Sequence, residues 1–278
     1  MKKAILAFTL AFCTLQAVEA QQLRTPAPSP ATTIKQEFAL SNVEVNYSRP
    51  AVRGRKIFGD LVPFGKVWRT GANAATTITF GEDVTVGDKA VPAGKYGLLT
   101  IPGQSEWTII ISKQTDVTSP ADYKQDQDVA RITAKAETLP FNVENFMIVF
   151  DNVKASSMDL EIIWANVGVA VPVKANIEEK IMSQIDNLMN KDNRPYFGAA
   201  MYYMENGKDL NKAVGWLDKA IEQNPNAFWI YHQKANALAK LGKKQEAIAT
   251  ANKSIELAKK AKNDDYVALN EKLLATLK

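Results

Sequence analysis

The sequence contains one cysteine and one histidine among its 278 residues. Cys13 lies in an N-terminal segment that we expect to be removed, so the mature chain would contain no thiol and no disulfide. A single histidine cannot form a metal site built from several histidines, and His232 is expected on the surface or in a groove of a helix. No GxSxG sequence, phosphate loop or dinucleotide fingerprint is present. We therefore predict no metal and no cofactor.

Long apolar runs are also missing, and none reaches the length of a transmembrane helix. The first twenty residues have the three parts of an export signal in the right order. Lys2 and Lys3 come first, the apolar run Ala4–Leu15 follows, and Val18–Ala20 forms a small-x-small cleavage site. We predict a signal peptide over residues 1–20 and a periplasmic or extracellular protein.

Two further features belong to this N-terminal region. Phe12 precedes Cys13 where a lipidation motif would carry a small residue, so we do not expect a lipid anchor. Residues 21–33 contain three prolines among alanine, serine and threonine, which predicts a flexible linker.

The charge of the chain is weakly biased. Its formal net charge is +4, which does not indicate the concentrated basic face of a nucleic-acid-binding protein. Four aspartates between Asp116 and Asp128 lack the spacing of a calcium-binding loop, and we predict a solvated loop there.

Residues 34–173 are predicted to form an all-β antiparallel sandwich or barrel. Alternating apolar segments recur with turn signals between them, and no helical segment separates them, as parallel strands would require. The predicted strands cover residues 41–47, 76–80, 83–86, 90–91, 96–101, 107–111, 129–138, 146–150, 158–164 and 167–173.

The hydrophobic period changes to that of helices near Lys174, so residues 174–278 are predicted to be all-α. Ala213 and Ala247 are 34 residues apart, and so are Leu217 and Ala251. This spacing resembles tetratricopeptide repeats, which are helix–turn–helix units of 34 residues. A helix from Ile177 and another over residues 266–277 are expected to cap the array, or the array to dock on the β domain. The repeats would bind a protein or peptide partner.

The stretch from Arg49 to Asn73 has neither the alternation of a strand nor the period of a helix. It reads RPAVRGRKIFGDLVPFGKVWRTGAN and places arginines beside glycines and aromatic residues. Guanidinium groups and loop amides bind carboxylates and phosphates, and aromatic rings stack on a guanidinium or a sugar. The candidate ligand-binding residues are Arg49, Arg53, Arg55, Trp68, Arg69 and Asn73.

This stretch also carries a resemblance. The motif RPxxRGRxIFGxLVPxGxxWRTGAN, followed by DVTV and AGKYGLLTIP, resembles a family of exported bacterial proteins catalogued as domain of unknown function 2911. The likeness covers about residues 35–173. It implies an exported β domain, sometimes followed by tetratricopeptide-like helices, and it implies no activity.

Three functions are compatible with these observations. The preferred one is a non-enzymatic exported protein whose arginines and Trp68 bind an anionic or carbohydrate ligand. The second is a carboxylate-based hydrolase of envelope glycans or peptides, which would show two carboxyl groups about 5 to 9 Å apart in a cleft. The third is a structural scaffold, in which the arginines would be buried and paired with internal carboxylates.

Overall fold

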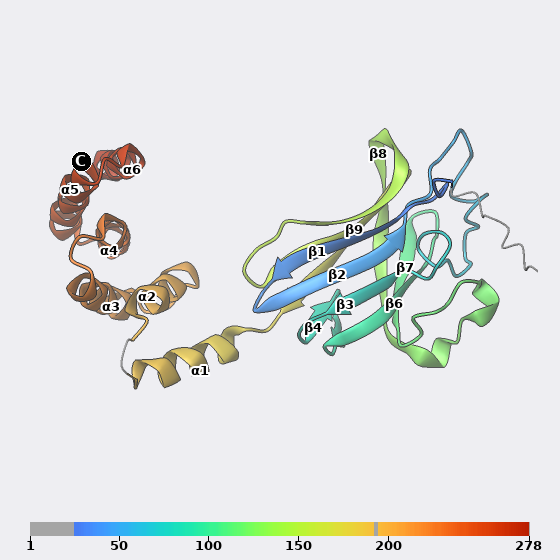
Figure 1. The fold of residues 1–278 in the computed structure, drawn as a ribbon, viewed down its shortest axis with the longest axis horizontal. Coiled ribbons are helices and arrows are strands. Elements are labelled where there is room, and N and C mark those ends of the chain that lie inside the picture. Colours follow the sequence, from blue (N-terminus) through green and yellow to red (C-terminus); the bar gives the residue numbers. More distant parts are fainter. Residues whose placement is uncertain (1–24, 192–193, 278) are drawn as a thin grey trace, which may run out of the picture. The chain divides into compact units, whose positions relative to one another are not determined.

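The structure of the protein is a computed structural model that describes residues 25–191 and 194–277. The predicted signal peptide lies outside the described residues, as does the start of the predicted linker. The chain divides after Ala175 into two compact units, which we call the β unit and the helical unit. The prediction of an all-β domain followed by a helical-repeat domain is confirmed (Figure 1).

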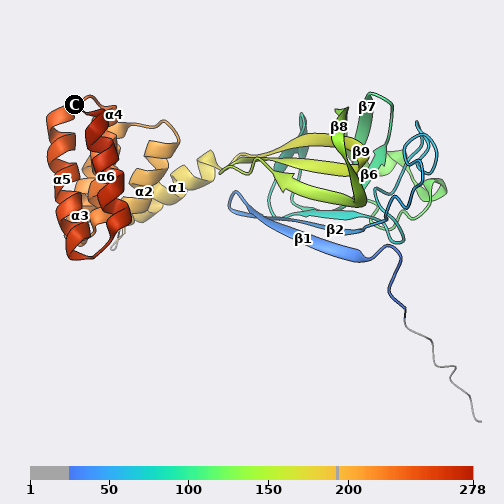
Figure 2. The same ribbon diagram turned by 90° about the horizontal axis from the view of Figure 1, so that it is seen from above.

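The described part of the β unit contains nine strands, joined in the order β1-β2-β3-β6-β7-β8-β9-β4-β5. Each strand is antiparallel to its neighbours. Figure 2 shows β1 and β2 in one layer and β8 and β9 in the other. The strands are β1 (Ala31–Phe38), β2 (Ser41–Ser48), β3 (Thr77–Phe80), β4 (Val84–Val86), β5 (Lys89–Val91), β6 (Gly94–Ile101), β7 (Glu106–Ser112), β8 (Asp128–Asp151) and β9 (Ser157–Ala175).

Strand β8 connects the two layers. It pairs with β7 as far as Lys135 and with β9 from Ala136 onward. The register between β8 and β9 shifts twice between Thr138 and Met147. Such irregularities break the alternation of side chains without ending the ladder. The prediction of four short strands in this region is therefore wrong, because each pair of them is one long strand.

Strand β1 was not predicted. It begins at Ala31, within the predicted linker, and pairs with β2 from Ala31 opposite Ser48 to Phe38 opposite Ser41. Phe38 is its one buried residue, and its other positions are exposed or half-buried. A strand at the edge of a sheet buries little surface, so its hydrophobic pattern is weak.

The main core of the β unit lies between the layers. Trp107, Phe146 and Trp164 are among its largest fully buried side chains. A smaller cluster forms on the opposite face of β6 and β7, because successive side chains of a strand point to opposite faces. There Leu99 and Ile110 pack against Val117, which holds the loop of residues 113–127 against the sheet.

The described helices of the helical unit follow one another in antiparallel pairs. Ala213 and Ala247, which define the 34-residue spacing, are fully buried, as small residues at a close approach of helices must be. Gly207 and Gly242 occupy equivalent turns, both with positive φ, where glycine is favoured. The helices are α1 (Glu178–Met189), α2 (Tyr196–Glu205), α3 (Leu210–Gln223), α4 (Phe228–Lys240), α5 (Lys244–Lys260) and α6 (Asp264–Thr276).

The two flanking helices contribute to the core of this unit. Ile185 of α1 is buried in the same cluster as Ala200 and Leu217. At the other end, Tyr266 of α6 packs edge-to-face on Phe228, with ring centroids 5.0 Å apart. The predicted capping role of both helices therefore has a packing basis within the unit.

His232 is buried in α4, so its predicted place on a helix surface or in a groove is wrong. Asn270 explains its position. The side-chain amide of Asn270 donates to Ser254 Oγ at 2.9 Å and to the carbonyl of Tyr266 at 2.6 Å. Since both amide hydrogens are used, Oδ1 of Asn270 accepts from Nδ1 of His232 at 2.9 Å. The histidine thus holds the last repeat and α6 together.

We predict that Asn270→Ala lowers the free energy of unfolding of the helical unit by about 1–3 kcal/mol, because it leaves the buried Nδ1–H of His232 without a partner and removes one of the hydrogen bonds of the buried Ser254. Urea denaturation followed by the helical circular dichroism signal measures this change. Asn252→Ala on the exposed face of α5 is the control and should shift stability by less than about 0.5 kcal/mol. Equal effects of the two substitutions would contradict the structural role of this network.

Candidate functional site

The stretch from Arg49 to Asn73 forms the long connection between β2 and β3. As predicted from its pattern, it contains no regular helix or named strand. Backbone hydrogen bonds fix it to the sandwich at separate points. The amide of Val52 donates to the carbonyl of Glu144 at 2.8 Å, and the amide of Trp68 donates to the carbonyl of Thr100 at 2.7 Å. The connection is therefore a defined loop, although it has no periodic pairing.

Trp68 anchors this loop in the aromatic core. Its ring stacks on Trp164 of β9, with centroids 5.9 Å apart and planes inclined by 15°. Phe146 of β8 meets the same ring edge-on at 5.2 Å. The indole Nε1 donates to the carbonyl of Gly71 at 3.0 Å. Such aromatic contacts contribute about 0.5–1.5 kcal/mol each beyond their buried area.

A cavity of about 450 Å³ opens beside these rings. This size is typical of small-molecule sites. Its walls combine two tryptophans, aliphatic residues and prolines with three cationic side chains. The lining residues are Ser29, Pro50, Arg55, Leu61, Val62, Pro63, Lys66, Val67, Trp68, Arg69, Gly71, Ala72, Pro120 and Trp164. No carboxylate is among these lining residues, so the charged side chains of the lining are all positive.

The structure brings three of the six candidate residues, Arg55, Trp68 and Arg69, to the cavity. Two donors of Arg55 are used within the loop. Its Nε donates to the carbonyl of Val52 at 3.0 Å, and its Nη2 donates to that of Ala51 at 2.6 Å. These bonds brace the turn that carries Arg55 and leave its charge without a carboxylate partner.

The other three candidates do not line the cavity and bind the chain itself. Arg49 Nε donates to the carbonyl of Phe146 at 3.0 Å. Arg53 Nη2 donates to the carbonyl of Pro28 at 3.1 Å, and Asn73 Nδ2 to that of Ser29 at 2.9 Å. Arg53 and Asn73 thereby hold the segment before β1 against the loop, and Ser29 of that segment forms part of the cavity wall.

No described ion pair involves any of the four arginines. The acceptors of their described side-chain hydrogen bonds are backbone carbonyls. The internal carboxylate partners that a purely structural role would show are thus not found among the described contacts of these side chains.

Arg69 has an unusual arrangement of hydrogen bonds. Its Nη1 donates to the carbonyl of Thr118 in the 113–127 loop. Its Nε is buried and has no hydrogen-bond partner among the described residues. A buried polar group in this state costs about 1–3 kcal/mol.

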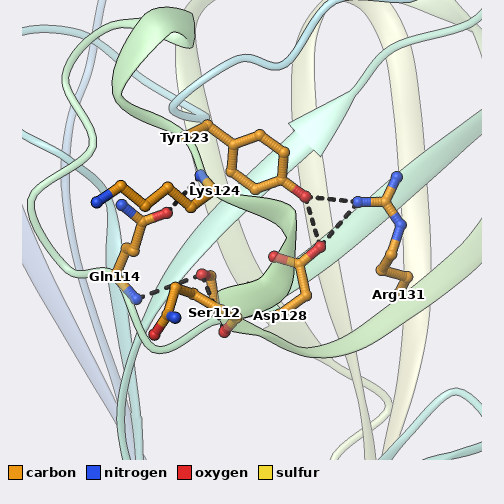
Figure 3. Close-up of polar contacts among 7 residues, drawn as sticks. Ser112, Gln114, Tyr123, Lys124, Asp128 and Arg131 are labelled. Atoms are coloured by element: carbon orange, nitrogen blue, oxygen red, sulfur yellow. Dashed lines mark hydrogen bonds and ion pairs between the residues drawn. The ribbon is translucent and has the colours of Figure 1, made fainter.

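The 113–127 loop supplies Pro120 to the cavity wall, and a polar cluster holds its base (Figure 3). Tyr123 donates its hydroxyl hydrogen to Oδ2 of Asp128, and Nη1 of Arg131 donates to that same oxygen at 2.8 Å. The carboxyl of Asp128 is only 6% exposed, so the predicted solvated loop is wrong at this residue. Gln114 ties the loop further through the carbonyl of Asp122 and the amide of Lys124.

The sequence did not identify Trp164 or Pro120 as site residues. Both lie far along the chain from the Arg49–Asn73 stretch, and they join it through the pairing of β8 with β9 and through the folded 113–127 loop. The sequence signal for Trp164 was a tryptophan near the end of a predicted strand, which is also typical of a core residue.

Comparison with known families identifies the two units. A family model described as protein of unknown function, DUF2911, matches residues 29–173, which is more than half of the chain. The chain belongs to the DUF2911 family. A tetratricopeptide repeat model matches residues 216–249, within the helical unit. No curated protein matches the chain. The cavity and its loops lie within the DUF2911 match, and the repeat indicates a protein-interaction module. Within the described residues, no helix has the length and apolar character needed to cross a membrane.

Burial and the neighbouring carboxylate of Asp128 raise the pKa of Tyr123 from 10.0 to about 12. The unfolded chain loses this proton near pH 10, whereas the folded chain keeps it. We therefore predict that the stability contributed by Tyr123 is complete below pH 10 and falls as the pH rises towards 12. The difference in phenolate absorbance between the wild type and Tyr123→Phe should show a step near pH 12. A step near pH 10 in the folded protein would contradict the assignment.

Proposed function

We propose that the β unit binds a small anionic ligand with an apolar or aromatic body in the cavity beside Trp68. The observation that carries this proposal is the lining itself, which combines Arg55, Lys66 and Arg69 with two tryptophans and no carboxylate. The positive side chains attract an anion, and the tryptophans and aliphatic residues shield an apolar body from water.

The composition of the lining favours an anion over a neutral carbohydrate. A neutral sugar needs acceptors as well as donors for its hydroxyl groups. The polar side chains of the lining are one serine and three cations, and neither lysine nor arginine offers an acceptor. The anionic form of the ligand prediction is therefore the one that we retain.

The two alternatives receive less support. A carboxylate-based hydrolase needs two carboxyl groups at the scissile bond, and the lining of this cavity supplies none. A scaffold role explains Arg49 and Arg53, which bind carbonyls of the chain. It does not explain why Lys66 and Arg69 face a cavity.

We further propose that the protein is exported and acts in the periplasm or outside the cell, on the basis of the signal pattern in residues 1–20. The helical unit would then present its repeats to a protein partner in the same compartment. On this proposal, the DUF2911 domain is the ligand-binding part of a two-part adaptor.

The charge of the cavity can be tested with two fluorescent probes of similar shape. Anilinonaphthalene sulfonate is an aromatic anion, and N-phenyl-1-naphthylamine is its neutral counterpart. We predict that the anion binds more tightly than the neutral probe, and that Lys66→Gln weakens anion binding about tenfold, because one of three positive charges is lost. Fluorescence titration measures both dissociation constants.

The matched control is Lys95→Gln in β6, since Lys95 is exposed and does not line the cavity. It should leave the affinity for the anion unchanged. If both probes bound equally well, or if the two lysine substitutions had equal effects, the proposed anion site would be wrong.

A further inference from the structure

Of the two arginines that line the cavity, Arg69 is the one whose side-on donor pair makes no hydrogen bond among the described residues. A guanidinium offers a planar pair of donors along the edge formed by Nε and Nη2. In Arg55 this pair is occupied, because Nε and Nη2 donate to the carbonyls of Val52 and Ala51. In Arg69 the described hydrogen bond uses Nη1, which lies outside the pair.

The free pair of Arg69 has two different environments. Among the described residues, Nε is buried and has no hydrogen-bond partner. Nη2 makes no described hydrogen bond either, but it keeps some exposure to solvent. A ligand that brings two coplanar oxygen atoms would give both nitrogens an acceptor at once, while the bond from Nη1 to Thr118 stays in place.

We infer that the ligand of the cavity is an apolar or aromatic carboxylate, held by Nε and Nη2 of Arg69. A carboxylate has two oxygens in one plane at the spacing of this donor pair, so it forms two parallel hydrogen bonds. Lys66 would add a point charge, and the tryptophan walls would cover the apolar body. This inference rests on the proposed anion site and specifies its ligand.

The rest of the cavity agrees with a single carboxyl group better than with a phosphate. A phosphate monoester carries close to two charges and three terminal oxygens, which usually need several donors or a loop of free amides. In this cavity, Nε and Nη2 of Arg55 already donate to carbonyls of the chain. The donor pair of Arg69 matches the two coplanar oxygens of a carboxylate, and Lys66 adds a further donor beside it.

The test compares 2-naphthoate, 2-naphthyl phosphate and 2-naphthamide on the full chain by isothermal titration calorimetry. We expect naphthoate to bind most tightly and naphthamide, which lacks the charge, to bind at least about tenfold more weakly. Tighter binding of the phosphate would overturn the carboxylate assignment while leaving the anion site intact. Absence of binding by naphthoate, the phosphate and anilinonaphthalene sulfonate would instead overturn the proposed function.

The role of the donor pair is tested by Arg69→Lys, which keeps the positive charge and removes the planar pair. We expect it to weaken naphthoate binding about tenfold or more. The control is Arg194→Lys in the helical unit, where Arg194 bonds within its own unit and lies outside the cavity. Equal naphthoate affinity of Arg69→Lys and the wild type would overturn the inference.

A spectroscopic measurement tests the same contact without relying on affinity. The proton NMR resonance of the Arg69 Nε–H group can be assigned by its loss in Arg69→Lys. It should move downfield on addition of naphthoate, because the group then donates to a charged oxygen, whereas it has no acceptor among the described residues of the free protein. An unchanged resonance at saturating naphthoate would show that the carboxylate binds elsewhere. Thermal denaturation of each variant confirms that it is folded.

Discussion

The stacking of Trp68 on Trp164 is the contact on which the candidate site depends. The connection from Arg49 to Asn73 has no ladder of its own, so few of its backbone groups are fixed by regular pairing. The ring of Trp68 packs on both Phe146 and Trp164 and fixes the second half of this connection in the core of the sandwich. The same ring forms a wall of the cavity. Stability of the loop and shape of the cavity therefore arise from one contact.

The arginines of the loop divide according to what they bind. Arg49 and Arg53 donate hydrogen bonds to carbonyls of the chain and hold neighbouring segments in place. In the part of the chain that the structure describes, the side chain of Arg69 has one hydrogen bond to the chain and a buried Nε without an acceptor. Carbonyls satisfy guanidinium donors without cancelling their charge. The family motif can thus stiffen the loop and keep the cavity positive at the same time, which paired carboxylates would not permit.

How much could be predicted depended on whether the signal was periodic. The 34-residue spacing of Ala213 and Ala247 could be recognised in the sequence, because each repeat packs only on its neighbours and the same buried positions recur in each repeat. The sequence pattern divides β8 and β9 into four short strands, because the register shifts between them interrupt the alternation of side chains as a turn would. Composition singled out the Arg49–Asn73 connection, part of which lines the cavity. It could not show that the side chains of Arg53 and Asn73 bind the carbonyls of Pro28 and Ser29. The direction of a side chain in an irregular loop is set by tertiary contacts.

One consequence concerns the order in which this site can form. The hydrogen bond from Arg49 to Phe146 joins residues 97 positions apart, and that from Tyr47 to Ile148 joins residues 101 positions apart. Contacts so distant along the chain close large loops and form slowly. The cavity wall at Trp164 is supplied by β9, the last strand of the sandwich. A chain translated from its N-terminus would complete the cavity only after the whole β unit has emerged, so a product truncated before β9 would lack the wall at Trp164.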